Sequence, residues 1–236
     1  MKTTFRIIVI VLFAVFYGCQ KNEVSIGVNS SITIDGLFSG TIGNDSNRID
    51  SIKAYDNNSL IGKSAVSSAG KFSVTLTTSF LHKIGNNYDG LIISDTTAIV
   101  ADVFDFKPYK GGVYAGYVSK DNSSINGSAK VDQSTSLFMY SDRTFTIKGT
   151  EIHVNTNNGF TYKININYSV TFKKGWNEFV CKTSYSTTST TTTVVETYSN
   201  TITSDLQWRY VPSPAFSVPA KTRGVQDVVR QGFLFR

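Results

Sequence analysis

The strict alternation of apolar and polar residues from Tyr162 to Phe172 is the feature that most constrains the fold of this chain. In that stretch aromatic and aliphatic side chains occupy every second position, and hydroxyl, amide and lysine side chains lie between them. A period of two places the apolar set on one face of a β-strand. The shorter stretch Phe72–Leu76 repeats the pattern, and glutamate, a good helix former, occurs only four times in the chain. We therefore predict an all-β protein.

Turn-forming residues separate these strands and divide the chain into two halves. Clusters of Asp, Asn, Gly and Lys recur between the predicted strands, which is typical of antiparallel sandwiches. The most polar long stretch inside the body is 119–128. We predict two antiparallel β-sandwich domains, at 31–120 and 130–211; one larger sandwich with a long crossover is the alternative. Three of the four prolines lie in the tail at 212–236, and proline opposes the interior of a sheet.

The amino terminus has the pattern of an export signal. Lys2 and Arg6 precede an uninterrupted apolar run of 11 residues at 7–17, shorter than the ~20 residues that a membrane-spanning helix needs. Gly18 and Cys19 follow, and this arrangement resembles the lipobox of bacterial lipoproteins, although Phe16 stands where leucine is usual. The resemblance implies a signal peptide at 1–18, a lipid anchor on Cys19 and a tether at 19–30. An ordinary secreted protein is the alternative.

The location follows from the same segment. The polar residues Gln20–Glu23 resemble the signals that send lipoproteins of the Bacteroidota to the cell surface. We therefore expect the protein at the outer membrane or the cell surface, held to the membrane through Cys19. A periplasm-facing location is the alternative, with 20–23 serving only as a solvated tether.

The charge of the body excludes a nucleic-acid partner. The whole chain has a formal charge of +6. Between residues 19 and 208, however, sixteen basic residues balance sixteen acidic ones, because the excess lies in the signal peptide and the tail. A neutral body has no basic footprint for nucleic acid.

The first half resembles a known β-sandwich. The segments 33–40, 49–55 and 70–76, the last beginning Gly-Lys-Phe, are similar to the transthyretin-like or carboxypeptidase-regulatory-like sandwich of many surface lipoproteins. That resemblance implies an adhesive, spacer or interaction module and carries no active-site residue. The Lys-Gly-Trp-Asn hairpin at 174–177 resembles uncharacterised lipoproteins of the Bacteroidota.

No residue pattern predicts a reaction. His82 and His153 lack the spacing of a zinc site, and we expect His153 to face solvent. Cys181 is expected to be a buried apolar side chain, because no activating residue lies nearby in the sequence. Asp102 and Asp105 are three residues apart on one strand, so their side chains are expected on opposite faces. We predict a protein that is not an enzyme, with no cofactor and no metal; a lipoprotein enzyme acting on glycans is the alternative.

Exposed aromatic residues indicate how such a protein makes contact with its surroundings. Trp176, Trp208 and Tyr109 fall at strand ends or loop edges, where rings stack on sugars or anchor a protein; the alternative is that they pack in the core, as most aromatic residues of a β-sandwich do. The triplets that contain Ser51 and Thr96 resemble the short O-glycosylation signal of the Bacteroidota. We expect a binding, adhesion or scaffold module for an extracellular protein or glycan ligand.

Overall fold

The computed structural model describes residues 31–212, except 39–48, 57–58, 79–80, 85–88, 104, 123–131 and 158. In this described part all sixteen secondary-structure elements are β-strands, which confirms the all-β prediction. The long strand expected at 162–172 is present as Phe160–Phe172, and its alternate residues Ile164, Ile166 and Tyr168 are buried. Cys19, the predicted signal peptide and tether, and the tail beyond residue 212 lie outside the described residues.

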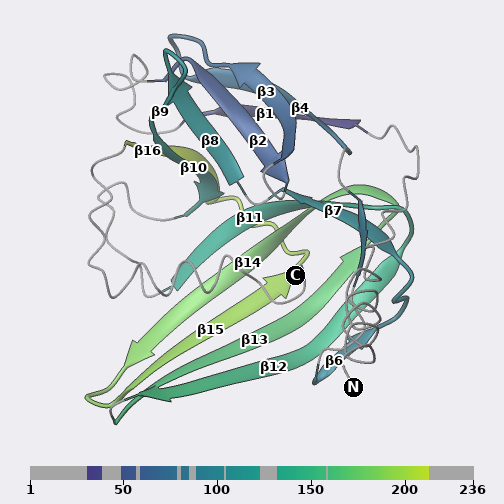
Figure 1. The fold of residues 1–236 in the computed structure, drawn as a ribbon, viewed down its shortest axis with the longest axis vertical. Helices are drawn as coiled ribbons and strands as arrows, with labels where there is room; N and C mark the ends of the chain where they lie inside the picture. Colours follow the sequence, from purple (N-terminus) through teal and green to yellow (C-terminus); the bar gives the residue numbers. More distant parts are fainter. Residues whose placement is uncertain are drawn as a thin grey trace, which may run out of the picture.

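The strands form an upper and a lower group in Figure 1. The upper group is β1 (Ser31–Leu37), β2 (Ser51–Asp56), β3 (Ser59–Ala65), β4 (Lys71–Thr77), β8 (Asp105–Lys110), β9 (Val113–Tyr114), β10 (Gly116–Asp121) and β16 (Gln207–Pro212). The lower group is β5 (His82–Lys83), β6 (Leu91–Ile93), β7 (Ile99–Val103), β11 (Asp132–Ser141), β12 (Phe145–Asn157), β13 (Phe160–Phe172), β14 (Gly175–Thr187) and β15 (Thr191–Ser199).

The upper group packs two layers of strands around one core. Strands β1 and β4 pair antiparallel as a separate two-stranded sheet, and they face the sheet that contains β3, β2, β8 and β10. Alternate residues of β4 are buried, as the pattern at 72–76 predicts. We call the buried set between the layers the first core: Ile34, Phe38, Ile49, Ile52, Ala54, Ile61, Phe72, Val74, Leu76, Phe106, Val118, Phe138, Trp208 and Tyr210.

The lower group continues the larger sheet of the upper group, because β10 pairs with β11, and its strands follow in the order β11-β14-β15-β13-β12-β6, drawn side by side in Figure 1. Strands β5 and β7 extend it beyond β11. The second core lies on one face of this sheet and comprises Ile84, Ala98, Val100, Met139, Phe145, Ile147, Ile164, Ile166, Tyr168, Val170, Phe172, Phe179 and Val194.

Strand order corrects the expectation of purely antiparallel sheets. Strand β15 runs parallel to β13 and is inserted between β13 and β14, although β14 follows β13 in the chain. Where β15 ends, the Asn200 side chain continues the ladder: its Oδ1 accepts from Thr171 N at 2.7 Å and its Nδ2 donates to Thr171 O at 3.0 Å. The threonine-rich hairpin is nevertheless confirmed, because β14 and β15 pair antiparallel and residues 187–190 at its tip are exposed.

The two cores draw on segments from both sides of the polar stretch at 119–128. Strands β6 and β7 precede that stretch but pair with β12 and β11, and Val100 belongs to the second core. Strand β16 follows it but pairs with β10, and Trp208 belongs to the first core. A single cut of the chain therefore does not separate the two cores.

The orientation of β12 corrects one prediction about a side chain. We expected His153 to face solvent; its side chain is 34% exposed, but its neighbours Ile152 and Val154 are the more exposed ones, at 59% and 61%. His153 instead shares the inner face of the sheet with Glu151, which is 5% exposed. The reason is tertiary, because the sequence around His153 alternates equally well in either register.

Candidate functional site

Trp208 is a core residue in this structure. Its side chain is 6% exposed, and its ring meets Phe72 and Phe106 edge to face, with centroids 5.0 and 5.2 Å away. It also stacks parallel to Phe138 at 6.4 Å. The indole therefore joins strands from both sheets, and its surface contacts protein rather than solvent.

Trp176 lies at the start of β14 and is half-buried. Its ring packs against the first core and makes an edge contact with Tyr140, with centroids 5.9 Å apart. Its Nε1 is buried and has no hydrogen-bond partner among the described residues. A tryptophan in this position is mainly a packing residue.

Tyr109 is the predicted contact residue that lies at the surface. It is the last residue but one of β8, and a tight hairpin returns the chain into β9, where Tyr114 pairs with it. The two turn residues, Gly111 and Gly112, have φ of 56° and 82°, which residues with a Cβ rarely adopt. The sequence Lys-Gly-Gly-Val thus fixes where Tyr109 and Tyr114 meet, with ring centroids 6.3 Å apart.

Asp50 holds this hairpin against the start of β2. Its Oδ2 accepts a hydrogen bond from Gly111 N at 2.6 Å, and its Oδ1 accepts from Ser51 Oγ at 2.9 Å. The hydrogen bond from the Gly111 backbone, followed by that from Ser51, lowers the pKa of the Asp50 carboxyl. The negative charge of Asp50 is therefore directed into the turn, and its two hydrogen bonds join the turn at Gly111 to the start of β2 at Ser51.

Strand β2 supplies the rest of the surface around Tyr109. In the β2–β8 ladder Ser51 lies opposite Tyr109, and Lys53 lies opposite Lys107. The hydroxyls of Tyr55 and Tyr109 are 3.1 Å apart and share a hydrogen bond. We call the outer surface formed by Lys53, Tyr55, Lys107, Tyr109 and Tyr114 the tyrosine–lysine face.

Lysine ammonium groups lie over the rings of this face. Lys53 Nζ is 4.0 Å from the centroid of the Tyr109 ring, and Lys107 Nζ is 4.7 Å from that of Tyr55. Both distances are in the range of cation–π attraction. The hydrogen bond to Tyr55 is the main reason that the pKa of Tyr109 is raised, so this phenol is neutral over the physiological range. The face therefore combines flat aromatic surface with positive charge.

The two O-glycosylation candidates lie in different places. Ser51 is half-buried beside Tyr109, so the structure brings these two predicted residues together. Thr96 is exposed in the turn between β6 and β7, in the lower group of strands. Of the two O-glycosylation candidates, Thr96 is therefore the more accessible to solvent.

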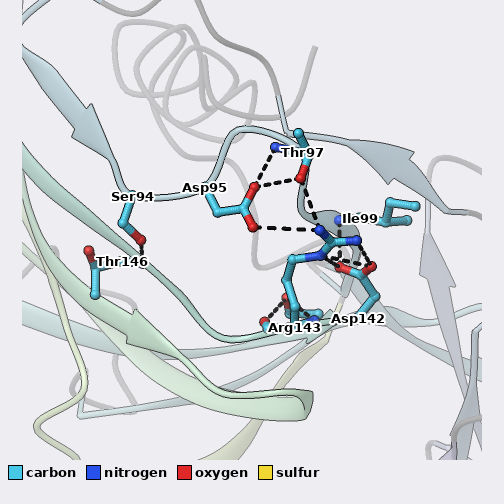
Figure 2. A network of polar contacts seen from close by, with 8 residues as sticks. Ser94, Asp95, Thr97, Ile99, Asp142, Arg143 and Thr146 are labelled. Carbon is cyan, nitrogen blue, oxygen red and sulfur yellow. Dashed lines mark hydrogen bonds and ion pairs between the residues drawn. The ribbon is translucent and has the colours of Figure 1, made fainter.

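Figure 2 shows that the turn beside Thr96 is fixed to the β11–β12 turn by a polar network. Asp95 Oδ1 accepts from Thr97 N at 2.9 Å and from Thr97 Oγ1 at 2.6 Å, while Arg143 NH1 donates to Thr97 Oγ1 at 2.9 Å. Arg143 also pairs with Asp142, whose Oδ1 accepts from Ile99 N at 2.8 Å. Burial pushes the pKa of Asp142 up, but the hydrogen bonds from Arg143 and Ile99 N outweigh it and lower that pKa. Thr96 is therefore held on a constrained, exposed turn.

Sequence reasoning identified Tyr109 but missed Tyr55, Lys53 and Lys107. One signal was available, because alternation in Ser51–Asp56 places residues 51, 53 and 55 on one face. The alignment of that face with Lys107 and Tyr109 depends on the pairing of β2 with β8, which are about fifty residues apart. Long-range pairing of this kind cannot be read from a local pattern.

The described residues show neither a group of metal ligands nor a membrane-spanning helix. Among the described residues no three His, Cys, Asp or Glu side chains are grouped as metal ligands require. In the same part of the chain, no helix has the length and apolar character to cross a membrane.

Comparisons with known proteins return no match: no family model, no curated protein and no solved structure is similar to this chain.

Proposed function

We propose that this protein is a non-enzymatic lipoprotein that acts as a binding, adhesion or scaffold module, with the tyrosine–lysine face as its contact surface. In this proposal residues 1–18 are a signal peptide and a lipid on Cys19 anchors the chain to the outer membrane or the cell surface. The body then forms two β-sandwich units, the first of the transthyretin-like kind. Its partner is an extracellular glycan or protein.

The observation that supports the binding role is the composition of the tyrosine–lysine face. Tyr114 is 50% exposed, and Tyr109 is half-buried with Lys53 over its ring, so the exposed ring surface beside the two lysines belongs mainly to Tyr114. Rings of this kind stack on the apolar faces of sugars, and ammonium groups pair with acidic groups. Asp50 is directed into the neighbouring turn, and Asp105 lies opposite Tyr55 in the β2–β8 ladder, so two lysines outnumber one remaining acidic residue and the charge balance of the face favours an acidic ligand. An acidic glycan satisfies both kinds of contact.

Affinity measurements with an acidic and a neutral polysaccharide test this role. The full chain, purified in detergent, is titrated with polygalacturonate and with dextran. We expect binding to polygalacturonate alone, and we expect Tyr109→Ala to weaken it about tenfold or more, since a central aromatic contact contributes more than ~1.4 kcal/mol. Raising the salt concentration weakens binding further because the lysine contacts are screened.

The matched control is Phe160→Ala, which removes a ring that is 41% exposed on β13 in the lower group. It should leave the affinity unchanged. If Phe160→Ala weakens binding as much as Tyr109→Ala, or if dextran binds equally well, the tyrosine–lysine face is not the contact surface.

Protease shaving of intact cells tests the proposed location. Native protein at the surface is digested from outside, whereas Cys19→Ala protein, without its anchor, is released in soluble form. Protection of the native protein until the outer membrane is opened would place the protein on the periplasmic side and would contradict a role in adhesion.

A further inference from the structure

The inner face of the lower sheet carries a group of ionisable side chains next to the second core. Strand register places them together: Glu151 and Glu196 lie on either side of Ile166, and Tyr198 lies beside Tyr168. Tyr162, four residues before Ile166, lies on the same face, as does Tyr185 opposite Val194. We call Glu151, Tyr162, Tyr185, Glu196 and Tyr198 the tyrosine–glutamate cluster.

Glu196 is the most deeply buried member of the cluster. Its residue exposure is 1%. Its Oε2 accepts a hydrogen bond from Tyr198 OH at 3.0 Å, but its Oε1 is buried without a hydrogen-bond partner among the described residues. A buried carboxylate oxygen that lacks a donor is strongly unfavourable, so such atoms are rare in native proteins unless a bound group satisfies them.

Two further polar atoms of the cluster show the same deficiency. Glu151 is 5% exposed, and its Oε2 has no hydrogen-bond partner among the described residues; His153 Nε2 lies 3.9 Å from it, beyond hydrogen-bond distance. The hydroxyl of Tyr162 is likewise buried without a partner in the described part of the chain. The cluster therefore presents two acceptor oxygens and one hydroxyl that require donors or acceptors from elsewhere.

The electrostatics of the cluster favour a cation. Alternation directs the nearby Lys163 and Lys182 to the opposite face of the sheet, so His153 is the one basic side chain that this face of β12, β13, β14 and β15 carries. Burial raises the pKa of Glu196 to about 7 and also raises that of Glu151. Burial is the main cause of both shifts, and it outweighs the lowering effects of His153 on the pKa of Glu151 and of Tyr198 on that of Glu196.

The aromatic residues around the carboxylates favour an organic cation. Tyr168 and Tyr198 stack with centroids 4.9 Å apart and close one side of the cluster. Tyr162 and Tyr185 are half-buried on the other side, so they border the solvent. Carboxylates set among aromatic rings are the usual environment for an ammonium group, which combines charge pairing with cation–π attraction.

We infer that the tyrosine–glutamate cluster is a binding site for a primary organic amine, and that a linear diamine matches it best. One ammonium group would donate to Glu196 Oε1 and a second to Glu151 Oε2. The two carboxylates stand on strands two places apart in the sheet, so their Cα atoms are about 10 Å from one another, and a short alkyl chain between two ammonium groups covers such a distance. The inference concerns residues distinct from the tyrosine–lysine face and does not depend on its ligand.

Isothermal titration calorimetry of the full chain in detergent tests the inference. The probe is 1,5-diaminopentane at pH 8, with galactose as a neutral hydroxyl-bearing probe of similar size. We expect one diamine bound per chain, and affinity at least tenfold weaker in Glu196→Gln, which keeps the shape and the acceptor for Tyr198 but removes the charge. We also expect binding to weaken tenfold or more between pH 8 and pH 5, because the carboxylate must ionise.

The control variant is Asp89→Asn, which removes an exposed carboxylate in the turn before β6 and should leave the affinity unchanged. Glu151→Gln serves as a second variant should Glu196→Gln fail to fold, and it also should lose at least tenfold in affinity. The inference is overturned if diamine does not bind, if it binds the folded Glu variants as tightly as the native protein, or if galactose binds as tightly as the diamine.

Discussion

Removing the Trp208 side chain tests how the upper group of strands is held together. The indole lies between the two layers and contacts Phe72 of β4, Phe106 of β8 and Phe138 of β11. Strand β16, which carries it, is the partner of β10 over six residue pairs. We expect Trp208→Ala to loosen the first core and the attachment of β16 at once.

The magnitude follows from the burial. An aromatic side chain that is 6% exposed removes about 200 Å² from water, and about 25 cal/mol per Å² gives ~5 kcal/mol as an upper value. Measured truncations of buried aromatic residues cost ~3–5 kcal/mol, including the cavity that remains. The melting temperature of a chain of this size should fall by roughly 2–4 °C per kcal/mol.

The assay is urea denaturation followed by fluorescence, since the chain has two tryptophans and Trp176 remains as the reporter. Trp176→Ala is the matched control, because that ring is half-buried and, among the described residues, makes an aromatic contact with Tyr140 alone. We expect it to cost less than half as much as Trp208→Ala. A Trp208→Ala protein with less than ~1.5 kcal/mol of destabilisation, or one no less stable than Trp176→Ala, would refute the assignment of Trp208 as the centre of the first core.

Two further predictions concern buried ionisable groups. Burial raises the pKa of the Cys181 thiol to about 12, so this thiol should not react in the folded protein at pH 8. In a Cys19→Ala protein Cys181 is the remaining cysteine, and thiol reagents should label the chain only after denaturant is added. Rapid labelling of the folded protein would contradict the burial of Cys181. Because the pKa of Glu196 is raised from 4.5 to about 7 in the folded state, the unfolded chain loses this proton first, and the free energy of unfolding should decline as pH rises from about 4.5 to 7. Glu196→Gln should remove that part of the decline and should be more stable than the native protein at pH 8 by about 1–3 kcal/mol. Urea titrations at several pH values measure this difference. An equal pH dependence of both proteins would show that Glu196 is not buried as described.

Part of the fold could be predicted from local patterns because those patterns have a direct physical cause. The alternating stretches at 72–76 and 162–172 became β4 and β13 with alternate residues buried, since the pleat sends successive side chains to opposite faces. The threonine-rich tract became the end of the β14–β15 hairpin because β-branched threonines favour extended backbone and their hydroxyls tolerate solvent. The parallel pairing of β13 with β15 has no local signature, and it was missed.

The candidate sites could be predicted only in part. Tyr109 was identified from its place beside a turn, and the turn chemistry of Gly111 and Gly112 accounts for its position. Trp208 was expected at a strand end or loop edge, and it does stand near the start of β16; its ring lies in the first core because β16 returns to pair with β10. His153 was expected in solvent, yet it shares a face with Glu151. In each case the outcome depended on which distant strand became the neighbour.

By itself the sequence determined that the described chain is built of strands, where several of them begin and end, and which residues alternate on each. These properties depend on neighbours one or two positions away, through backbone geometry and turn chemistry. The tertiary structure decided which face of β12 is inner and which strands contribute to each of the two cores. It also placed Glu151 and Glu196 on one face of the sheet and brought the Tyr55 hydroxyl to that of Tyr109. Those outcomes depend on pairing between segments far apart in the chain, where one residue of register exchanges the buried face of a strand for the exposed one.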